Sequence, residues 1–249
     1  MKRYYGWRPD KPDHRDFKFA QRLPIPPVLP PKVDLRPGCS PVEDQGQLGS
    51  CTANALVGGY EFLEIKAGVP FWDASRLFVY YFERYLEGTV GEDSGAEIRD
   101  GIKVLATYGV CPETMWPYVI SKFTKKPCAK QIAEAKKHTI TSYYRIDTLA
   151  EMKTCLAAGY PFTFGFSVYD SFESDEVAAT GVVPIPGPDE QLLGGHAVLA
   201  VGYDDSTGRF IVRNSWGMWG DKGYFYMPYE YLTDRNLSDD FWYVEKESA

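Results

Sequence analysis

Apolar residues recur at a helical spacing in three stretches between about residue 50 and residue 138. These stretches are CTANALVGGYEFLEIKAG, which ends at Gly68, DASRLFVYYFERYLEG, expected to begin after an Asp73 cap, and GAEIRDGIKVLATYG, which closes with a glycine. In the first of them, positions 53, 56, 57, 60 and 63 share one helix face. The pattern therefore predicts a mostly helical first half.

From about residue 139 the apolar period falls toward two, which is typical of β-strands. The predicted strands are TITSYYRI, PFTFGFSVY, HAVLAVGYD, GRFIVRNSW and GYFYMPYEYL, with turn sequences such as DDSTG and GDKG between them. One short helix, TLAEMKTCLAAG, interrupts this half. A helical half followed by a β half favours two lobes, and clefts between lobes are where sites form.

Composition and charge narrow the class of protein. The 249 residues are 44% hydrophobic and 15% aromatic, as in a globular protein with a large core. A net charge of -7 argues against nucleic acid as a partner. No run reaches the roughly 18 apolar residues of a membrane span, and charges stand where a signal peptide would be apolar. We expect a monomer that binds no membrane, in the cytoplasm or exported by a signal-independent route.

Metal and cofactor sites are not indicated by the cysteines and histidines. CxxC and HExxH motifs are absent, and His14, His138 and His196 lie far apart in the chain. We therefore expect no metal and no cofactor. The cysteines other than Cys51 allow two disulfides, one or none, and reduced core thiols are an equal alternative; they are Cys39, Cys111, Cys128 and Cys155.

The N-terminal segment differs in composition from the rest. Residues 1–31 hold seven of the 18 prolines and seven Lys or Arg against three Asp, a charge of +4 that leaves -11 for the remainder. One interpretation is a flexible, extended tail, because proline-rich sequence builds no core. The other is a basic strap laid over an acidic groove, since opposite charges favour docking. Its aromatic residues would be Tyr4, Tyr5, Trp7, Phe17 and Phe19.

Cys51 stands where a glycine-rich turn meets the first predicted helix, in EDQGQLGSCTANA. Unpaired N–H groups and the helix dipole at such a position favour a thiolate. A thiolate nucleophile needs a base, and His196, which begins a strand after two glycines, can reach from a sheet end into a cleft. Asn214 can orient the imidazole, and the neighbouring Trp216 can shield that bond from water. Taken singly, each of these residues has an ordinary structural role.

Gln45 is the candidate anion stabiliser. It precedes Cys51 by six residues across the glycine-rich turn. Its side-chain amide and the backbone N–H of Cys51 can converge on one oxyanion. With Cys51, His196 and Asn214 it completes the set of groups that acyl transfer through a thiol requires.

These stretches, in this order, resemble the papain-like cysteine peptidases. DQGQLGSCTANA resembles that family's active-site segment, GGHAVLAVGY its histidine strand, and RNSWGMWGDKGY its Asn-Ser-Trp-Gly segment. KVDLR, at residues 32–36, resembles the start of mature members, and DSGAEIRDGIKVLATYGVCPETMWPY the wall of the substrate cleft. The short segment before KVDLR is most similar to the microbial xylellain-type branch, in which such a segment covers the cleft.

The resemblance implies an α+β, two-lobed fold with the active site in the cleft. The peptidase domain would span 33–249, with a helical lobe at about 40–138 and a β-barrel-like lobe at about 139–235. Residues 1–32 would be a short propeptide that acts as an intramolecular inhibitor. The implied reaction is cleavage of a peptide or protein substrate through an acyl-enzyme thioester, most simply by an endopeptidase.

The resemblance also assigns roles to residues. Cys51 would be the nucleophile, His196 the base and then acid, Asn214 the orienting residue and Gln45 the oxyanion donor. Ser94 and Gly95 would hold the substrate backbone, and Trp216 and Trp219 would cover the primed side. The pocket for the second residue upstream of the cut would take bulky apolar or aromatic side chains, because small residues line it: Gly95, Gly165, Gly195 and Ala197.

The chain departs from the family pattern in ways that leave specificity open. Thr52 stands where most members have tryptophan, Leu48 replaces the cysteine of the usual first disulfide, and the GMWG loop is one residue shorter. Two alternatives use the same residues: an acyltransferase or deamidase, since an amine as well as water can resolve a thioester, and a catalytically silent peptide-binding module.

Overall fold

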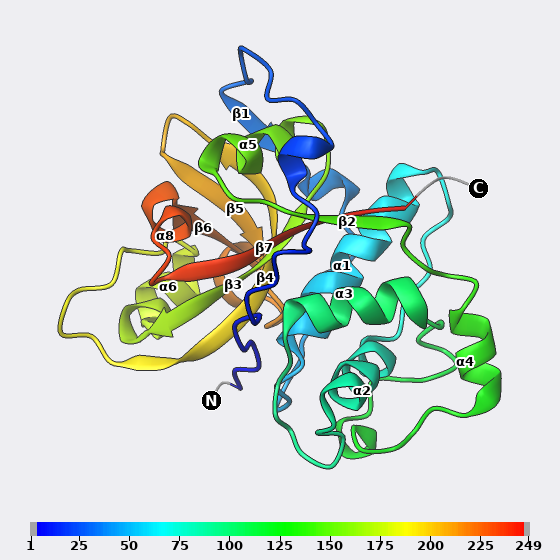
Figure 1. Cartoon of the computed structure of the whole chain (residues 1–249). Coiled ribbons are helices and arrows are strands. Elements are labelled where there is room, and N and C mark those ends of the chain that lie inside the picture. The colour runs from blue at the N-terminus through cyan, green and yellow to red at the C-terminus, as the bar shows by residue number, and fades with distance from the viewer. Residues whose placement is uncertain (1–3, 247–249) are drawn as a thin grey trace.

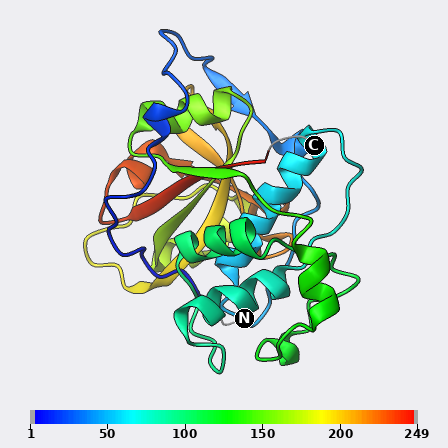
Figure 2. The same ribbon diagram turned by 45° about the vertical axis from the view of Figure 1, so that its right-hand side comes forward.

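Two large hydrophobic cores and one small cluster hold the described part of the chain together. The structure is a computed structural model that describes residues 4–246. One core is built mainly from helices of the first half, and the other from strands of the second half together with Phe19. Figures 1 and 2 show these parts as a helical lobe and a sheet lobe, with the N-terminal chain running between them. The predicted two-lobed α+β arrangement is confirmed.

The helical lobe is organised around a long central helix. The helices are α1 (Cys51–Lys66), α2 (Arg76–Glu87), α3 (Ile98–Thr107) and α4 (Ala129–Ala135). Helix α1 contacts α2 and α3 on one side and strand β4 on the other, so it is buried along almost its whole length. The expected Asp73 cap is wrong: Ser75 caps α2 by accepting from Phe78 N, while Asp73 pairs with Arg76.

The sheet lobe is an open antiparallel sheet rather than the expected barrel-like one. Its order is β2-β7-β3-β4-β5-β6, with β1 paired to β4, and no described pairing joins β2 to β6. The strands are β1 (Lys32–Asp34), β2 (Ser142–Arg145), β3 (Phe162–Tyr169), β4 (Leu192–Asp204), β5 (Arg209–Arg213), β6 (Tyr224–Pro228) and β7 (Ser238–Glu245). Sequence patterns missed β7, which lies between the edge strand β2 and β3.

Short helices connect and cover the strands. They are α5 (Leu149–Ala157), α6 (Asp175–Thr180), α7 (Trp219–Lys222), α8 (Tyr229–Thr233) and the 3-10 turns Phe19–Gln21, Arg36–Gly38, Ile120–Lys122 and Asp170–Glu173. The predicted helix after residue 147 is present as α5, capped by Thr148. The stretch YEYL, expected to extend a strand, instead forms α8, because Pro228 ends β6 at the turn into the helix.

The N-terminal chain has two structurally different parts. Residues 4–10 lie between the lobes, where Trp7 pairs with Ala96 in a parallel bridge and donates to the carbonyl of Gly195. Farther along, Phe19 is completely buried in the core of the sheet lobe. Between these parts, residues 11–15 are mostly exposed. The chain therefore crosses the interlobe region first and anchors in the sheet lobe afterwards.

Candidate active site

Cys51 is the first residue of α1 and is fully buried. The turn before it is shaped by Gly46, which has a positive φ of 59° and donates to Asp44. Ser50, at the helix cap, makes no side-chain capping bond to the first turn. The N–H groups in the first turn of α1 therefore receive no cap from this side chain.

His196 and Asn214 are brought together by the pairing of β4 with the end of β5. His196 Nε2 and Asn214 Oδ1 are 2.8 Å apart, and both residues are buried. The indole of Trp216 stacks on the imidazole with ring centroids 4.6 Å apart. Because an amide oxygen only accepts, Nε2 carries the proton in this bond, which leaves Nδ1 as the basic nitrogen. The amide of Asn214 and the indole of Trp216 thus both contact the imidazole of His196.

Gln45 lies in a fixed orientation beside the same strand end. Its Oε1 accepts from Ser215 Oγ at 2.7 Å, so the amide NH2 must point the other way. That Nε2 donates to the carbonyl of Leu48 at 2.9 Å and to the carbonyl of Tyr4 at 3.1 Å. The group that the sequence assigned to an oxyanion thus already holds a peptide carbonyl oxygen of the N-terminal chain.

The sulfur of Cys51 contacts both lobes and the N-terminal chain. Burial raises the pKa of the thiol to about 12, and N–H groups of Ala197, Gly6 and Thr52 offset part of this rise. Ala197 follows His196 in β4, so the sulfur lies beside the backbone of the strand that carries the candidate base. Because Gly6 supplies one of these N–H groups, the N-terminal chain seals the thiol from water.

The predicted substrate-binding glycines face the N-terminal chain. A Cβ at Gly95 would lie 2.1 Å from the carbonyl oxygen of Gly6, and Cβ atoms at Gly165 and Gly195 would meet Trp7 at 2.0 and 2.5 Å. These three positions form a narrow track that only glycine permits. The backbone of Ala96 binds the N-terminal chain beside these glycines: its N–H donates to the carbonyl of Gly6, and its carbonyl accepts from the N–H of Arg8. The sequence analysis did not predict this residue.

The remaining predicted residues lie nearby in different roles. Ser94 turns its hydroxyl to Thr89 and to the carbonyl of Gly95, so its side chain shapes the turn. Trp219 packs edge-on against Trp216 at 5.2 Å and is only half-buried. Sequence reasoning also missed Asp240, a buried carboxylate at the far end of the track, because β7 was not predicted.

Other features of the described chain bear on the chemistry. All five cysteines, which lie within residues 4–246, are free. Within the same residues no group of three or more His, Cys, Asp or Glu side chains is placed to hold a metal ion. The helices of this described part are also too short or too polar to cross a bilayer.

Comparison with known proteins agrees with this geometry. The family model "Papain family cysteine protease" matches residues 29–240. The crystal structure of xylellain, a cysteine protease from Xylella fastidiosa, is 45% identical, with a TM-score of 0.93 over 99% of both chains. An uncharacterized peptidase C1-like protein of Acanthamoeba polyphaga mimivirus is 42% identical over 99% of this chain and 88% of its own.

More distant relatives match a smaller share of each sequence. A cathepsin L-like proteinase of Fasciola hepatica is 30% identical over 80% of this chain and 60% of its own length. The model match spans both lobes and the stretches that hold Cys51, His196 and Asn214. The chain therefore belongs to the papain family of cysteine proteases.

Proposed function

We propose that Cys51, His196 and Asn214 cleave peptide bonds in protein substrates and that residues 4–10, here called the latch, hold the enzyme latent. The observation that carries the catalytic part is the buried 2.8 Å bond between His196 and Asn214 beneath the stacked Trp216. It leaves the other imidazole nitrogen to take the proton of the Cys51 thiol, which lies at the N–H of the next residue in β4.

The reaction follows from these groups. The Cys51 thiolate attacks the substrate carbonyl carbon, and the negative charge that forms on oxygen is stabilised by the Gln45 amide and the Cys51 N–H. Protonated His196 then gives its proton to the leaving amine, which breaks the C–N bond and leaves a thioester. A water molecule, deprotonated by His196, attacks the thioester and releases the acid and the thiol.

The latch occupies the positions that this reaction needs. The Tyr4 carbonyl accepts from Gln45, so it fills the place of a substrate carbonyl oxygen. At the sulfur, the latch presents the N–H of Gly6. The latch therefore occupies the space beside Cys51 that a substrate would need.

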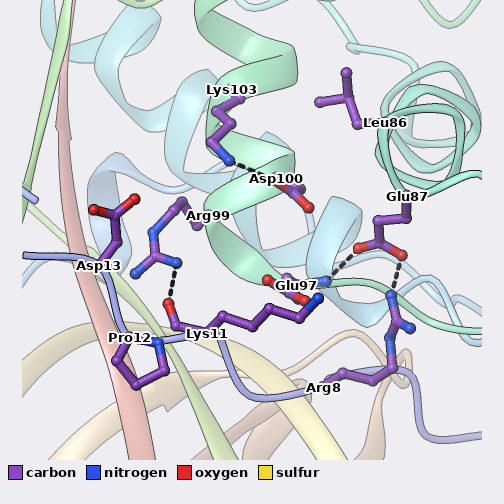
Figure 3. Close-up of a pocket in the computed structure, with 10 residues that line it drawn as sticks. All are labelled: Arg8, Lys11, Pro12, Asp13, Leu86, Glu87, Glu97, Arg99, Asp100 and Lys103. Atoms are coloured by element: carbon purple, nitrogen blue, oxygen red, sulfur yellow. Dashed lines mark hydrogen bonds and ion pairs between the residues drawn. The ribbon is translucent and has the colours of Figure 1, made fainter. Parts of the chain in front are cut away.

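An ion pair of the latch and a hydrogen bond to the residue after it hold the N-terminal chain against the helical lobe. Arg8 pairs with Glu87, whose other carboxylate oxygen accepts from the N–H of Glu97, and Arg99 donates to the carbonyl of Lys11 (Figure 3). The side chain of Glu87 is 6% exposed and that of Arg8 is 42% exposed, so this ion pair is screened less than one between two fully exposed side chains. This ion pair supports the interpretation of the segment as a basic strap on an acidic surface.

Farther along, an acid of the latch docks against arginines, in the opposite sense to the expected charge pattern. Asp10 is buried, and its oxygens accept from Arg99 N at 3.0 Å and Trp242 Nε1 at 2.8 Å. Burial, and then the charge of Asp240, raise the pKa of Asp10 to about 7. Burial raises the pKa of Asp240 as well, and Arg145, which is 3.0 Å from Asp240 and 3.7 Å from Asp10, offsets part of that rise.

The burial of Phe19 limits how much of the N-terminal chain can be removed without disturbing the fold. It is fully buried among residues of the sheet lobe, so truncation at residue 32 would open a cavity in that core. The exposed loop at residues 11–15 is a better boundary. We propose that release of the latch leaves residues from about 15 onward in place, as part of the folded domain.

The experiment uses the full chain with a recognition sequence for a site-specific protease inserted between His14 and Arg15. The chain is folded, cut and separated from the freed peptide, and is then tested on a fluorogenic dipeptidyl-arginine amide under reducing conditions. We expect activity only after cutting. Cys51→Ala should abolish it, whereas Cys128→Ala, at an exposed cysteine on α4's cap, should retain it.

Two results would contradict the proposal in different ways. Equal activity before and after cutting would mean that the latch does not inhibit. A cut chain that cleaves no peptide, while an epoxide still alkylates Cys51, would mean that the nucleophile is real and the reaction has been assigned wrongly.

A further inference from the structure

Two asparagines from different lobes, Asn54 and Asn214, border one small internal cavity. Asn54 lies in the first turn of α1, three residues after Cys51, and Asn214 follows the last residue of β5. Both are buried, with exposed fractions of 5% and 3%. The cavity has a volume of about 10 Å³, which is close to the space that one water molecule takes.

One end of each amide is fixed by its hydrogen bonds, so the direction of the other end follows. Asn54 Nδ2 donates to the carbonyl and the hydroxyl of Ser50 at 2.9 and 3.1 Å. Asn214 Oδ1 accepts from the N–H of Ser215 and from His196 Nε2, each at 2.8 Å. Asn54 Oδ1 and Asn214 Nδ2 therefore lie at the opposite ends of their amides.

These two atoms are an acceptor and a donor, and both are unsatisfied. Asn54 Oδ1 and Asn214 Nδ2 are buried and have no hydrogen-bond partner within residues 4–246. A buried polar atom without a partner is costly. One water molecule in the cavity between them would accept from Asn214 Nδ2 and donate to Asn54 Oδ1, which satisfies both atoms and gives the water the two polar partners that it needs.

We propose that Asn54 is a positioning residue, which acts through one buried water molecule to hold the Asn214 amide in the orientation that His196 requires. This inference rests on the proposed role of Asn214 in the peptidase reaction. It adds to that reaction a link between the lobes, because Asn54 belongs to the helix that carries Cys51 and Asn214 to the lobe that carries His196.

The orientation of the Asn214 amide determines which imidazole nitrogen is basic. With Oδ1 toward the ring, His196 Nε2 carries the proton and Nδ1 is left to take the proton of the Cys51 thiol. A turned amide would present its NH2 to Nε2, and the proton of the neutral ring would then lie on Nδ1. The N–H of Ser215 fixes one end of the amide, and the water molecule fixes the other.

The first experiment compares Asn54→Leu with Asn54→Ala in the chain cut between residues 14 and 15. Both variants lose the bonds to Ser50 and the acceptor Oδ1. Leucine has the shape of asparagine and places a methyl group at the position of Oδ1, so Asn214 Nδ2 loses its link to the helix. Alanine instead leaves a polar space, which water can fill. We expect kcat to fall about ten-fold in Asn54→Leu with little change in KM, and to stay within about three-fold of the unmodified cut chain in Asn54→Ala.

The stability of the two variants is the control for a role in packing alone. The larger cavity should make Asn54→Ala the less stable of the two in urea titration. The less stable variant should therefore be the more active one, whereas a side chain that only fills space would give the same order for stability and for kcat. A kcat in Asn54→Leu equal to or above that of Asn54→Ala would overturn the inference.

Crystal structures of the full, uncut chain separate this inference from the proposed function. We expect a water molecule within hydrogen-bond distance of both Asn54 Oδ1 and Asn214 Nδ2, and in Asn54→Leu a longer distance between Asn214 Oδ1 and His196 Nε2. If no substrate is cleaved, the peptidase assignment fails, and these structures decide the inference alone. A cavity without water, or an Asn214 amide that is unmoved in Asn54→Leu, would refute it.

Discussion

Replacing Trp7 by alanine should open the active site without altering the enzyme body. Trp7 is only 8% exposed and donates to Asp240. Truncation of a buried aromatic side chain costs about 3–5 kcal/mol, and loss of a hydrogen bond to a charged group adds about 1.5–3 kcal/mol. Because these contacts exist only when the latch is docked, the equilibrium constant for docking should fall by roughly 10³-fold or more.

The assay measures how fast iodoacetamide alkylates each cysteine, by peptide mapping in the mass spectrometer. Cys51 is fully buried and its thiol pKa is raised to about 12 by burial, so it reacts only while the latch is open. Cys128 is exposed and serves as an internal reference in the same molecule. We expect the ratio of the Cys51 rate to the Cys128 rate to rise by orders of magnitude in Trp7→Ala.

The matched control is Phe17→Ala. Phe17 is an aromatic residue of the same N-terminal segment, but its side chain is 63% exposed and lies outside the latch. Its replacement should leave the ratio of the Cys51 and Cys128 rates unchanged. If Trp7→Ala also left that ratio unchanged, the reasoning that this side chain holds the latch in place would be refuted.

Four further predictions follow from the same contacts. Gly6→Ala should also expose Cys51 to alkylation, because its Cβ would lie 1.8 Å from a backbone oxygen; a rate like that of the unmodified chain would contradict this. Because docking raises the pKa of Asp10 from 3.8 to about 7, binding of a synthetic peptide of residues 4–12 to the cut chain should weaken by roughly 10²- to 10³-fold as pH rises from 4 to 7, and a peptide with asparagine at position 10 should show a flatter pH profile in calorimetric titration. Asn214→Ala in the cut chain should lower kcat roughly 10²-fold or more with little change in KM, and steady-state kinetics that show the reverse split would argue against an orienting role. Phe19→Ala should lower the free energy of unfolding by about 3–5 kcal/mol in urea titration without speeding Cys51 alkylation under native conditions, which separates the anchor from the latch.

Helices and strands in which apolar residues recur at a regular spacing could be predicted from the sequence. The helix from Cys51 was correct at its start because a glycine-rich turn ends where apolar spacing begins, and α5 was found from its apolar pattern. The cap of α2 was assigned to Asp73 instead of Ser75, since both are good capping residues and only the fold decides which hydroxyl or carboxylate reaches Phe78 N. Strand β7 was missed because its bulge interrupts the alternation of buried and exposed residues.

The N-terminal segment illustrates what local patterns leave open. The composition of this segment favoured neither a flexible tail nor a docked strap. Its excess of basic residues suggested only contacts between these residues and acidic groups of the body. In the structure, Arg8 meets an acid of the helical lobe, whereas Asp10 meets arginines and a second acid. Charge counts cannot show this, because they do not say which side chains of the body come to the surface at the place where the segment docks.

The sequence by itself determined the family, the order of the lobes and the identity of the candidate nucleophile, base and orienting residue. Those properties depend on short motifs whose spacing along the chain is enough to recognise them. Tertiary structure alone decided that Tyr4, Gly6 and Trp7 fill the site and that Asp240 accepts a hydrogen bond from Trp7. The residues concerned are more than 230 positions apart at the extremes, and their contact arises only when β7 pairs with β3 beside the interlobe cleft, a long-range pairing that no local pattern encodes.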